Sequence, residues 1–415
     1  MKRFFDDLET RSPAERETGY SRKLSHMVEL GYEHSEWVRD TFDTLGLKPA
    51  DVRSVADLEK LPVISREQVI DFELQNLPFG GFCRVDADID RIFTSPGPVY
   101  EPHLTEKEPL WRRGYSAAGF GKGDIVLNTF SYHMVAAGLT FHEGLRAVGA
   151  TVVPSGTSST EIQVQLINHL KVNGYTGTPS FLMAIITKAE EMGYDVKKDF
   201  TIRKANFVAE PLQASLRNKF EEEYGIDTYQ MYGATEVGDI AYECSEKRGW
   251  HICEEVIVEI VDPDSGKRVE PGQLGEVVVT RLNDVFFLFR FGTGDLSSLT
   301  EEACPCGRTS YKMNGIAGRV GDAVKVRGLF IAPSQLSTIK ERFNNINYQI
   351  VITRESYRDY VTAVIETGND EHQLTERFEK HFQSICTVKI DAFELVTPGS
   401  ISDGDKMLID KRNWE

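Results

Sequence analysis

Asp124-Ile-Val-Leu-Asn128 opens the stretch of sequence that decides the fold class. Its apolar run predicts a short strand, and a second strand-like run follows at 151–154. Segments with apolar residues at helical spacing lie between and after these runs, at 137–148, 160–173 and 179–192. Because strands alternate with helices, the stretch predicts an α/β fold with a mostly parallel sheet covered by helices.

The flanking regions have different patterns. Residues 1–100 are mostly helical in pattern, with apolar residues at helical spacing over 13–45. Beyond Gly318, strand-like and helix-like segments mix in a smaller unit. We therefore expect a large N-terminal domain over 1–317 and a small α+β C-terminal domain over 318–415. The end of the large domain should be a β-rich subdomain with strands at 256–261, 275–280 and 286–291.

Composition limits the function classes. The chain has 415 residues, of which 40% are hydrophobic, so it can bury a sizeable core. Its formal net charge of −17 disfavours general binding of nucleic acid or of an anionic membrane. No apolar run reaches membrane-spanning length, and Met1-Lys-Arg-Phe-Phe-Asp-Asp is followed by charge and not by the apolar segment of a signal peptide. We expect a cytoplasmic protein whose six cysteines are thiols or metal ligands.

Two glycine-containing motifs carry side chains that can bind a nucleotide. Tyr232-Gly-Ala-Thr-Glu236 offers a ring for a purine, a hydroxyl for a phosphate and a carboxylate for Mg²⁺. Gly292-Thr-Gly-Asp295 offers a carboxylate for a ribose diol. Taken alone, the first motif is equally consistent with a turn that has a capping Thr and a solvated Glu. The second, taken alone, is more typical of an ordinary turn.

Two segments near the C-terminus suggest movement. Gly318-Arg319 opens a stretch with three glycines, and glycines supply the backbone freedom that a hinge needs. Lys406 lies in a loop with few apolar residues, from which it could bring positive charge to a reacting phosphoryl or carboxylate group. The alternatives are an ordinary interdomain hairpin and a solvated lysine.

A set of soft ligands predicts a metal site. Cys244 and His251 flank one turn, and Cys304-Pro-Cys306 forms a second cluster farther along the chain. Cysteine and histidine in two clusters suit a closed tetrahedral Zn²⁺ site. Cys253 is a competing ligand, and the alternative is a set of buried thiols.

In their order and spacing, the motifs resemble the adenylate-forming superfamily, and within it the phenylacetate–CoA ligase branch. The likeness covers most of the chain from about Asp124 to the C-terminus. It rests on Val208-Ala-Glu-Pro211, Tyr232-Gly-Ala-Thr-Glu-Val-Gly238, Gly275-Glu-Val-Val-Val-Thr280, Cys304-Pro-Cys-Gly-Arg308, Gly328-Leu-Phe-Ile-Ala-Pro-Ser-Gln335 and Ile409-Asp-Lys-Arg412. The resemblance implies an enzyme that uses ATP to make an acyl-AMP and pyrophosphate. A C-terminal lid would then rotate, and the acyl group would pass to coenzyme A.

The resemblance also implies roles for residues of the nucleotide site. Tyr232 would stack on the adenine, and Thr235 would contact the α-phosphate. Glu236 would hold the Mg²⁺, while Asp295 and Arg319 would bind the ribose. Further nucleotide contacts would come from Ala209, Glu210, Pro211 and Gly233.

Roles outside the nucleotide site follow in the same way. Asp322 would be the hinge of the lid, and Lys406 would bridge the carboxylate and the α-phosphate during adenylation. Such a bridge is chemically sensible, because a carboxylate that attacks a phosphate needs cations to neutralise both anions. The branch often carries the same four metal-ligand positions, so the resemblance favours structural Zn²⁺ at Cys244, His251, Cys304 and Cys306.

The phosphate loop is the largest departure from the family pattern. The family has a Ser/Thr-Gly-Thr-Thr-Gly run, whereas this chain has Thr94-Ser-Pro-Gly-Pro98. Thr94, Ser95 and Gly97 are the phosphate ligands that remain, and the two prolines remove backbone donors. Weak use of ATP is therefore expected, with nucleotide binding retained.

The acyl pocket is expected around two aromatic-rich segments. Aromatic rings there could embrace an aryl group. His133 is as consistent with a packed histidine as with a group that orients the carboxylate. The candidate pocket residues are Phe130, Tyr132, His133, Phe141, Thr178 and Pro179.

The residues and the resemblance together predict an ATP-dependent acyl-CoA ligase for an aryl or arylacetic acid. It would act in the cytoplasm as a homodimer, with ATP, Mg²⁺ and coenzyme A as ligands and with a structural Zn²⁺. Two alternatives stay open. One is a family member with impaired ATP use that makes acyl-AMP or transfers it to another acceptor. The other is a non-catalytic nucleotide- or CoA-binding protein.

Overall fold

A computed structural model describes residues 4–84, 86–95, 97–103, 109–273, 275–316, 318–320, 324–327, 329–331, 333–343, 346–355, 357–367, 371–386, 388–402 and 405–412. The chain divides into two compact units, Met1–Leu212 with Leu216–Val320 and Gln213–Ser215 with Gly321–Glu415. The division at Val320 lies close to the boundary predicted at residue 318. Asp322, the predicted hinge, lies outside the described residues.

The first unit contains a mixed sheet. Among the described residues it has nine strands, in the order β14-β15-β10-β9-β8-β7-β6-β4-β5. Strands β5, β4, β6, β7 and β8 are parallel neighbours, whereas β8, β9, β10, β15 and β14 pair antiparallel. The predicted α/β fold is confirmed. The sheet is mixed because only residues 235–237 separate β8 from β9, which is too short a connection for a crossover helix.

The strands of this sheet are β4 (Ile125–Asn128), β5 (Thr151–Val153), β6 (Gly174–Gly177), β7 (Lys204–Phe207), β8 (Asp227–Ala234), β9 (Gly238–Glu243), β10 (Trp250–Ile252), β14 (Leu299–Thr300) and β15 (Lys312–Met313). The helices around it are α4 (Arg112–Ala117), α5 (Ala136–Ala147), α6 (Thr160–Leu170), α7 (Pro179–Glu191), α8 (Val196–Asp199) and α9 (Ala214–Asn218).

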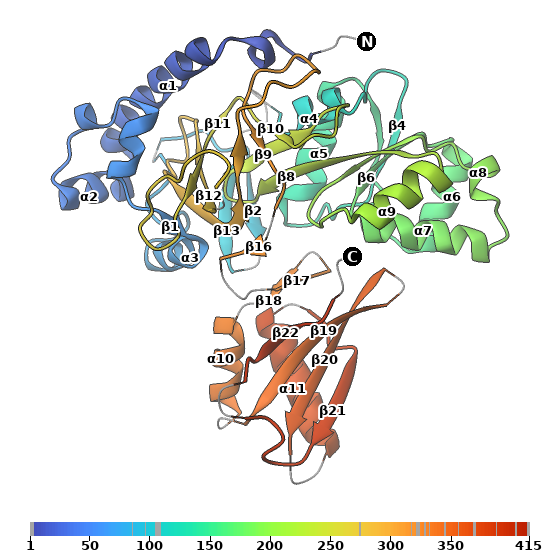
Figure 1. Cartoon of the computed structure of the whole chain (residues 1–415). Coiled ribbons are helices and arrows are strands. Elements are labelled where there is room, and N and C mark those ends of the chain that lie inside the picture. The colour runs from blue at the N-terminus through green and yellow to red at the C-terminus, as the bar shows by residue number, and fades with distance from the viewer. Residues whose placement is uncertain are drawn as a thin grey trace. The chain divides into compact units, whose positions relative to one another are not determined.

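Helices cover both faces of the parallel strands (Figure 1). On one face, Val126 of β4 belongs to the same hydrophobic cluster as Phe141 of α5 and Tyr115 of α4. On the other face, Leu127 of β4 belongs to the cluster formed by α6, α7 and α9, which includes Ile186. Successive residues of a strand point to opposite faces, so the apolar run at 125–127 supplies both cores.

A second sheet in this unit packs beside the first. It consists of β1 (Ile64–Ser65), β11 (Val256–Val261), β12 (Gly275–Arg281), β13 (Phe291–Ser297) and β16 (Gly318–Arg319). The strands predicted at 256–261 and 275–280 are confirmed. The strand predicted at 286–291 is wrong, because β13 begins only at Phe291.

Local hydrogen bonds explain why residues 286–290 do not form a strand. The Asn283 side chain accepts the N–H groups of Val285 and Phe286, and Arg290 has a left-handed φ of 48°. This backbone lets the buried Arg290 guanidinium reach Glu259, at an N–O distance of 3.1 Å. The Gly292–Asp295 motif therefore lies inside β13 and does not follow a strand.

Helices make up most of the N-terminal part of the first unit. α1 (Pro13–His34) and α2 (Glu36–Leu45) fulfil the helical pattern over 13–45. The break between them falls at Ser35, whose hydroxyl caps the start of α2. α3 (Arg66–Gln75) begins with a capping box between Ser65 and Gln68. Three short 3-10 turns complete this region, at Asp7–Thr10, Pro49–Asp51 and Val55–Lys60.

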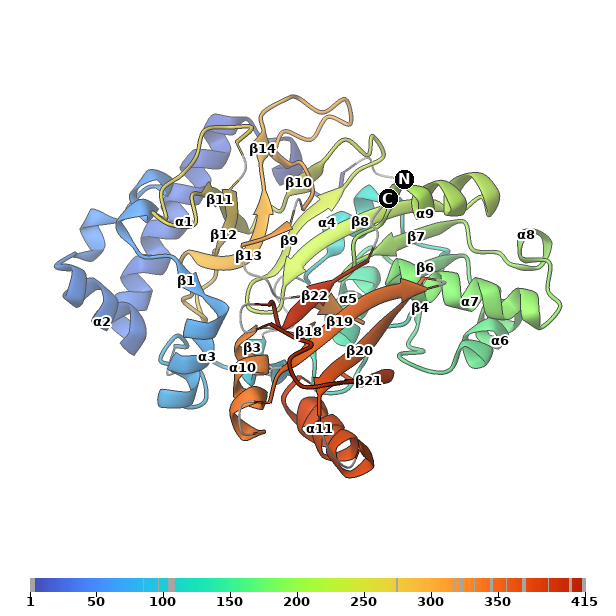
Figure 2. The same cartoon turned by 60° about the horizontal axis from the view of Figure 1, so that its bottom comes forward.

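The second unit is a small α+β fold (Figure 2). Four of its described strands form a sheet in the order β21-β20-β19-β22, and β17 pairs with β18 in a separate two-stranded sheet. In the core of this unit, Phe378 and Phe382 of helix α11 (Glu371–Cys386) pack with Ile350. The elements are β17 (Val324–Val326), β18 (Leu329–Ile331), α10 (Pro333–Arg342), β19 (Tyr348–Glu355), β20 (Arg358–Glu366), α11 (Glu371–Cys386), β21 (Ala392–Val396) and β22 (Leu408–Asp410). In the described parts of both units, no helix is long and apolar enough to cross a membrane.

Candidate functional site

Three predicted nucleotide residues meet where the two sheets of the first unit approach each other. Tyr232 lies in β8, Asp295 in β13 and Arg319 in β16. The Tyr232 hydroxyl donates to Asp295 Oδ2 at 2.8 Å, and Arg319 Nε lies 3.4 Å from Asp295 Oδ1. The antiparallel register of β13 and β16 places Asp295 opposite Arg319. The structure thus joins residues from separate motifs into one cluster.

Burial and the nearby Asp295 carboxylate raise the pKa of Tyr232 well above its usual value. The phenol therefore stays a neutral hydrogen-bond donor. One side of its ring is already occupied, because Trp250 stacks on it with ring centroids 5.8 Å apart. The sequence prediction missed Trp250, because a single tryptophan in a short strand gives no sign that it stacks on a distant tyrosine. A purine would have to use the opposite face of the ring.

Thr235 and Glu236 lie in the short connection after β8 and are covered by a residue of α3. Arg66 Nη1 lies 2.5 Å from Glu236 Oε1 and donates to Thr235 Oγ1 at 3.4 Å. The Glu236 side chain is only 1% exposed, so this guanidinium is its main counter-charge. Arg66 was not predicted, since it is 169 positions away from Thr235 in the sequence.

The predicted phosphate loop forms the end of a closed hairpin, apart from Pro96, which lies outside the described residues. β2 (Arg91–Ser95) and β3 (Val99–His103) pair in register, with Ser95 opposite Val99. The Ser95 hydroxyl is buried and donates to Glu101 Oε1 at 2.5 Å. The Thr94 N–H donates to the Met134 carbonyl at 2.8 Å. A Cβ at Gly97 would lie 3.0 Å from Ile70 of α3, so the tip packs against that helix.

Two buried carboxylates lie in and behind this hairpin. Glu73 of α3 accepts the Tyr100 N–H at 2.8 Å, and Glu101 accepts the Ser95 hydroxyl. Burial, with a smaller contribution from the negative charge of Glu236, raises the pKa of each carboxyl group to about 7. In the described part of the hairpin, two donors are therefore already used within the protein, and two buried acidic groups lie beside them.

The segment after β7 connects the nucleotide and acyl candidates. Ala209 has a left-handed φ of 71°, which is unusual for a non-glycine residue. Glu210 Oε2 accepts the Ser180 hydroxyl at 2.5 Å. Thr178 caps α7 by accepting the Phe181 N–H, and the buried Pro179 occupies the first turn of that helix. Glu210 therefore contacts the start of α7, next to two predicted pocket residues.

The remaining pocket candidates form two groups. Phe130 stacks on Phe141 with ring centroids 4.6 Å apart, and the ring centroid of Trp111 also lies 4.6 Å from that of Phe141. Tyr132 belongs to a polar group, because its hydroxyl accepts from Asn128 Nδ2 at 2.8 Å and lies 3.2 Å from His142 Nδ1. His133 is exposed. The sequence prediction missed Trp111, Asn128 and His142.

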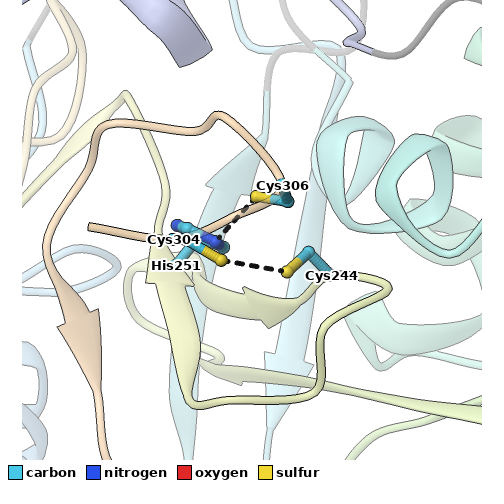
Figure 3. A group of neighbouring side chains, drawn as sticks. All are labelled: Cys244, His251, Cys304 and Cys306. Atoms are coloured by element: carbon cyan, nitrogen blue, oxygen red, sulfur yellow. Dashed lines mark hydrogen bonds between the residues drawn. The ribbon is translucent and has the colours of Figure 1, made fainter. Parts of the chain in front are cut away.

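The four predicted metal ligands come together (Figure 3). One ligand atom from each of Cys244, His251, Cys304 and Cys306 lies within 4.8 Å of the others, and all four residues are buried. Cys244 Sγ is 3.7 Å from Cys304 Sγ, and Cys306 Sγ is 3.4 Å from His251 Nε2. Cys253, the competing candidate, instead donates to Asp239 at 3.5 Å. Cys244 follows β9, His251 lies in β10, and the other two lie between β14 and β15.

A hydrogen-bond partner at Nδ1 of His251 supports metal binding through its other ring nitrogen, Nε2. His251 Nδ1 lies 3.3 Å from the buried Ser310 hydroxyl. A hydrogen bond at one ring nitrogen fixes the ring and leaves the other nitrogen for a metal. The neighbouring Cys244 and His251 also lower the pKa of the Cys306 thiol, which favours the thiolate form. These soft, buried and convergent donors fit a tetrahedral Zn²⁺.

The chain is similar to a family of AMP-binding enzymes and to several phenylacetate-coenzyme A ligases. A family model described as AMP-binding enzyme matches residues 107–283. The phenylacetate-coenzyme A ligase of Thermus thermophilus is 30% identical over 361 residues, which cover 83% of this chain and 80% of that protein. The phenylacetate-coenzyme A ligase of Escherichia coli is 30% identical over 420 residues, which cover 95% of this chain and 94% of that protein.

Solved structures similar to this one share its fold. A 2-hydroxyisobutyryl-CoA ligase with 2-HIB-AMP and CoA, in its thioesterification state, superposes with a TM-score of 0.90 and 23% identity. The alignment covers 100% of this chain and 93% of that chain. An amide bond synthetase from Marinactinospora thermotolerans has a TM-score of 0.57 and 16% identity, over 93% of this chain and 92% of that chain.

Proposed function

Because the chain belongs to the phenylacetate–coenzyme A ligase family of adenylate-forming enzymes, we propose that it is an AMP-forming acid–thiol ligase. It activates a carboxylic acid with ATP and passes the acyl group to coenzyme A. The carboxylate attacks the α-phosphorus of ATP, and pyrophosphate leaves. The sulfur of coenzyme A then attacks the acyl carbonyl, and AMP leaves. The cluster of Tyr232, Asp295 and Arg319 is the observation that carries the proposal.

The cluster supplies the contacts that an adenosine needs. Tyr232 would offer the ring face opposite Trp250 to the adenine. Asp295 offers carboxylate oxygens to the ribose hydroxyls, and Arg319 holds that carboxylate in place. Thr235 follows on the same strand end and can donate its hydroxyl to the α-phosphate. Ala209, Glu210, Pro211 and Gly233 are proposed to complete the adenosine side.

Oxygen ligands suitable for Mg²⁺ are present at Glu236 and Thr235. When bound there, the ion would neutralise phosphate charge. Glu236 now pairs with Arg66, so the ion would replace the guanidinium as the counter-charge of this buried carboxylate. Lys406 of the second unit is proposed to supply a further positive charge during adenylation.

The acyl substrate is proposed to be an aryl or arylacetic acid. Phe130, Phe141 and Trp111 form a cluster of aromatic rings that suits an aryl group. Tyr132, Thr178 and Pro179 would complete the pocket. A panel of carboxylic acids, assayed for AMP release with and without coenzyme A, tests the proposed activity. Acid-dependent AMP release that rises with coenzyme A would support it.

Replacing Asp295 by alanine is expected to weaken AMP binding at least tenfold. Each lost hydrogen bond between the carboxylate and a ribose hydroxyl costs about 1.5–3 kcal/mol. Calorimetric titration with AMP measures the effect, and Asp264→Ala in an exposed turn is the matched control. Unchanged AMP affinity in a folded Asp295→Ala protein would remove Asp295 from the site.

The closed hairpin leads to a second prediction, that the native KM for ATP is high. The Ser95 hydroxyl and the Thr94 N–H are already used within the protein. A variant with residues 95–98 replaced by Gly-Thr-Thr-Gly should lower the KM for ATP about tenfold or more, since each regained donor is worth about 1.5–3 kcal/mol.

AMP affinity should be the same in both proteins, because the adenosine contacts lie elsewhere. Steady-state kinetics and AMP titration measure the two quantities, with thermal melting as the check on folding. An equal KM for ATP in both proteins would mean that the hairpin is a working phosphate site. The closed hairpin is also the observation that favours the alternative of a family member with impaired ATP use.

The buried cysteine–histidine cluster is proposed to hold one structural Zn²⁺. Its ligands join the β9–β10 turn to the loop between β14 and β15, so a bound ion would cross-link the two segments. A cytoplasmic location and a homodimeric state are also proposed. Light scattering on the purified protein measures the oligomeric state.

A further inference from the structure

A row of buried polar side chains crosses the parallel part of the nine-stranded sheet. Asn128 of β4 is the register partner of Thr176 in β6, and Thr176 is the partner of Asn206 in β7. All three side chains are buried and lie near the carboxyl ends of their strands. In open α/β sheets, ligands bind at these ends. Partners in register point to the same face, so the three side chains form one row.

The first two members of the row have hydrogen-bond partners within the protein. Asn128 Nδ2 donates to the Gly138 carbonyl at 2.9 Å and to the Tyr132 hydroxyl. The Thr176 hydroxyl pairs with the Tyr115 hydroxyl at 2.8 Å. Every polar group of this part of the row is therefore tied to α4, α5 or the segment between β4 and α5.

Asn206 is different. Its side chain is 1% exposed, and neither Nδ2 nor Oδ1 has a hydrogen-bond partner among the described residues. An orphaned donor and an orphaned acceptor in one buried amide are rare, because both have lost water without a replacement. A small group that both donates and accepts a hydrogen bond would satisfy Oδ1 and Nδ2 of Asn206 together.

Asn206 lies on the same face of the sheet as the aromatic cluster of the proposed acyl pocket. α4 crosses this face of the sheet, since Tyr115 reaches Thr176 of β6 and a Cβ at Gly114 would lie 2.3 Å from Met231 of β8. β7 lies between β6 and β8. The hydrophobic cluster on the same face contains Trp111, Phe141 and Val208. Val208 follows Asn206 by two positions and begins the Val208-Ala-Glu-Pro211 segment.

We propose that Asn206 is a specificity-determining residue of the acyl pocket, which selects an aryl acid with a hydroxyl group on its ring. The inference rests on the proposed ligase function. A ring hydroxyl donates to Oδ1 and accepts from Nδ2, so it satisfies both orphaned groups. The aromatic ring of the substrate would pack against the apolar cluster that contains Trp111, Phe141 and Val208. A charged substituent would be disfavoured, because burial without a counter-ion penalises it.

The test compares phenylacetate with its ortho, meta and para hydroxy isomers as substrates for AMP release. The native protein should prefer one hydroxy isomer at least tenfold in kcat/KM over phenylacetate, because an acid without the hydroxyl leaves the amide unpaired. Asn206→Leu, which is similar in size and apolar, should abolish or reverse this preference. Thr176→Val is the matched control, since it removes a hydrogen bond of the same row and should change all four acids alike.

Binding measurements separate this inference from the proposed function. Non-hydrolysable N-acylsulfamoyl adenosines of phenylacetate and of the hydroxy isomers bind without any turnover. If no acid gives AMP release but the native protein still prefers a hydroxylated analogue and Asn206→Leu does not, the proposed function fails and the inference stands. If turnover is normal and the preference is the same in both proteins, the inference is overturned.

Two further outcomes are decisive. A complex in which Asn206 holds only a water molecule, with no preference among the four acids, would overturn the inference. Should Asn206→Leu fail to fold, Asn206→Ser keeps a polar group of shorter reach and is measured instead. It should lower the preference for the hydroxy isomer, and an unchanged preference would count against the inference.

Discussion

Replacing Lys406 by alanine is expected to slow acyl-adenylate formation by about 10²–10³-fold, the size typical of losing one group that stabilises charge in a transition state. Thioester formation from presynthesised acyl-AMP should stay close to that of the native protein. The lysine lies in an exposed loop before β22, whose backbone is fixed by the bond from Gln349 Nε2 to the Lys406 carbonyl. Removing the side chain should therefore leave the fold intact.

Single-turnover assays of the two half-reactions measure the effect, and Lys380→Ala on the exposed surface of α11 is the control. The separation of effects follows from the proposed lid, which presents different residues in the two steps. Equal loss in both half-reactions would mean that Lys406 supports the structure and not the adenylation step.

Loss of the metal site is expected to have the largest effect on stability. Cys304→Ser should reduce bound zinc from about one ion per chain to none, because three remaining ligands no longer close a tetrahedral site. The free energy of unfolding should fall by more than about 4 kcal/mol, since binding of a structural metal contributes directly to folding. Metal analysis and chemical denaturation measure the two changes.

Cys83→Ser is the matched control for this prediction. Cys83 is also a buried thiol, but its Sγ donates to the Arg84 carbonyl and it lies outside the four-residue cluster. The variant should keep its zinc and most of its stability. Native protein prepared without chelators that contains no zinc would contradict the metal site.

Much of the fold could be predicted from local sequence pattern. The strand at 125–128 and the helix pattern over 13–45 were found because hydrophobic spacing and capping residues agree there. The prediction of a strand at 286–291 was wrong, although this apolar run is largely buried. Asn283 and Arg290 divert the backbone through side-chain hydrogen bonds that no periodicity reveals.

The candidate site was predicted only in part, for a related reason. Motifs identified Tyr232, Asp295 and the four metal ligands, because these residues stand in recognisable local patterns. Arg66 and Asn206 stand in none. Their proposed roles rest on long-range packing, which places Arg66 beside Glu236 and leaves the Asn206 amide buried with no hydrogen-bond partner among the described residues.

Exchange of labelled pyrophosphate into ATP, measured without coenzyme A across a panel of aryl and arylacetic acids, tests the central claim most directly. The claim is that the protein forms an acyl-AMP intermediate. At least one acid should give exchange that depends on that acid, and adding coenzyme A should then release AMP and acyl-CoA in equal amounts. Formation of ADP and phosphate in place of AMP and pyrophosphate, or no exchange with any acid at saturating ATP, would contradict the account.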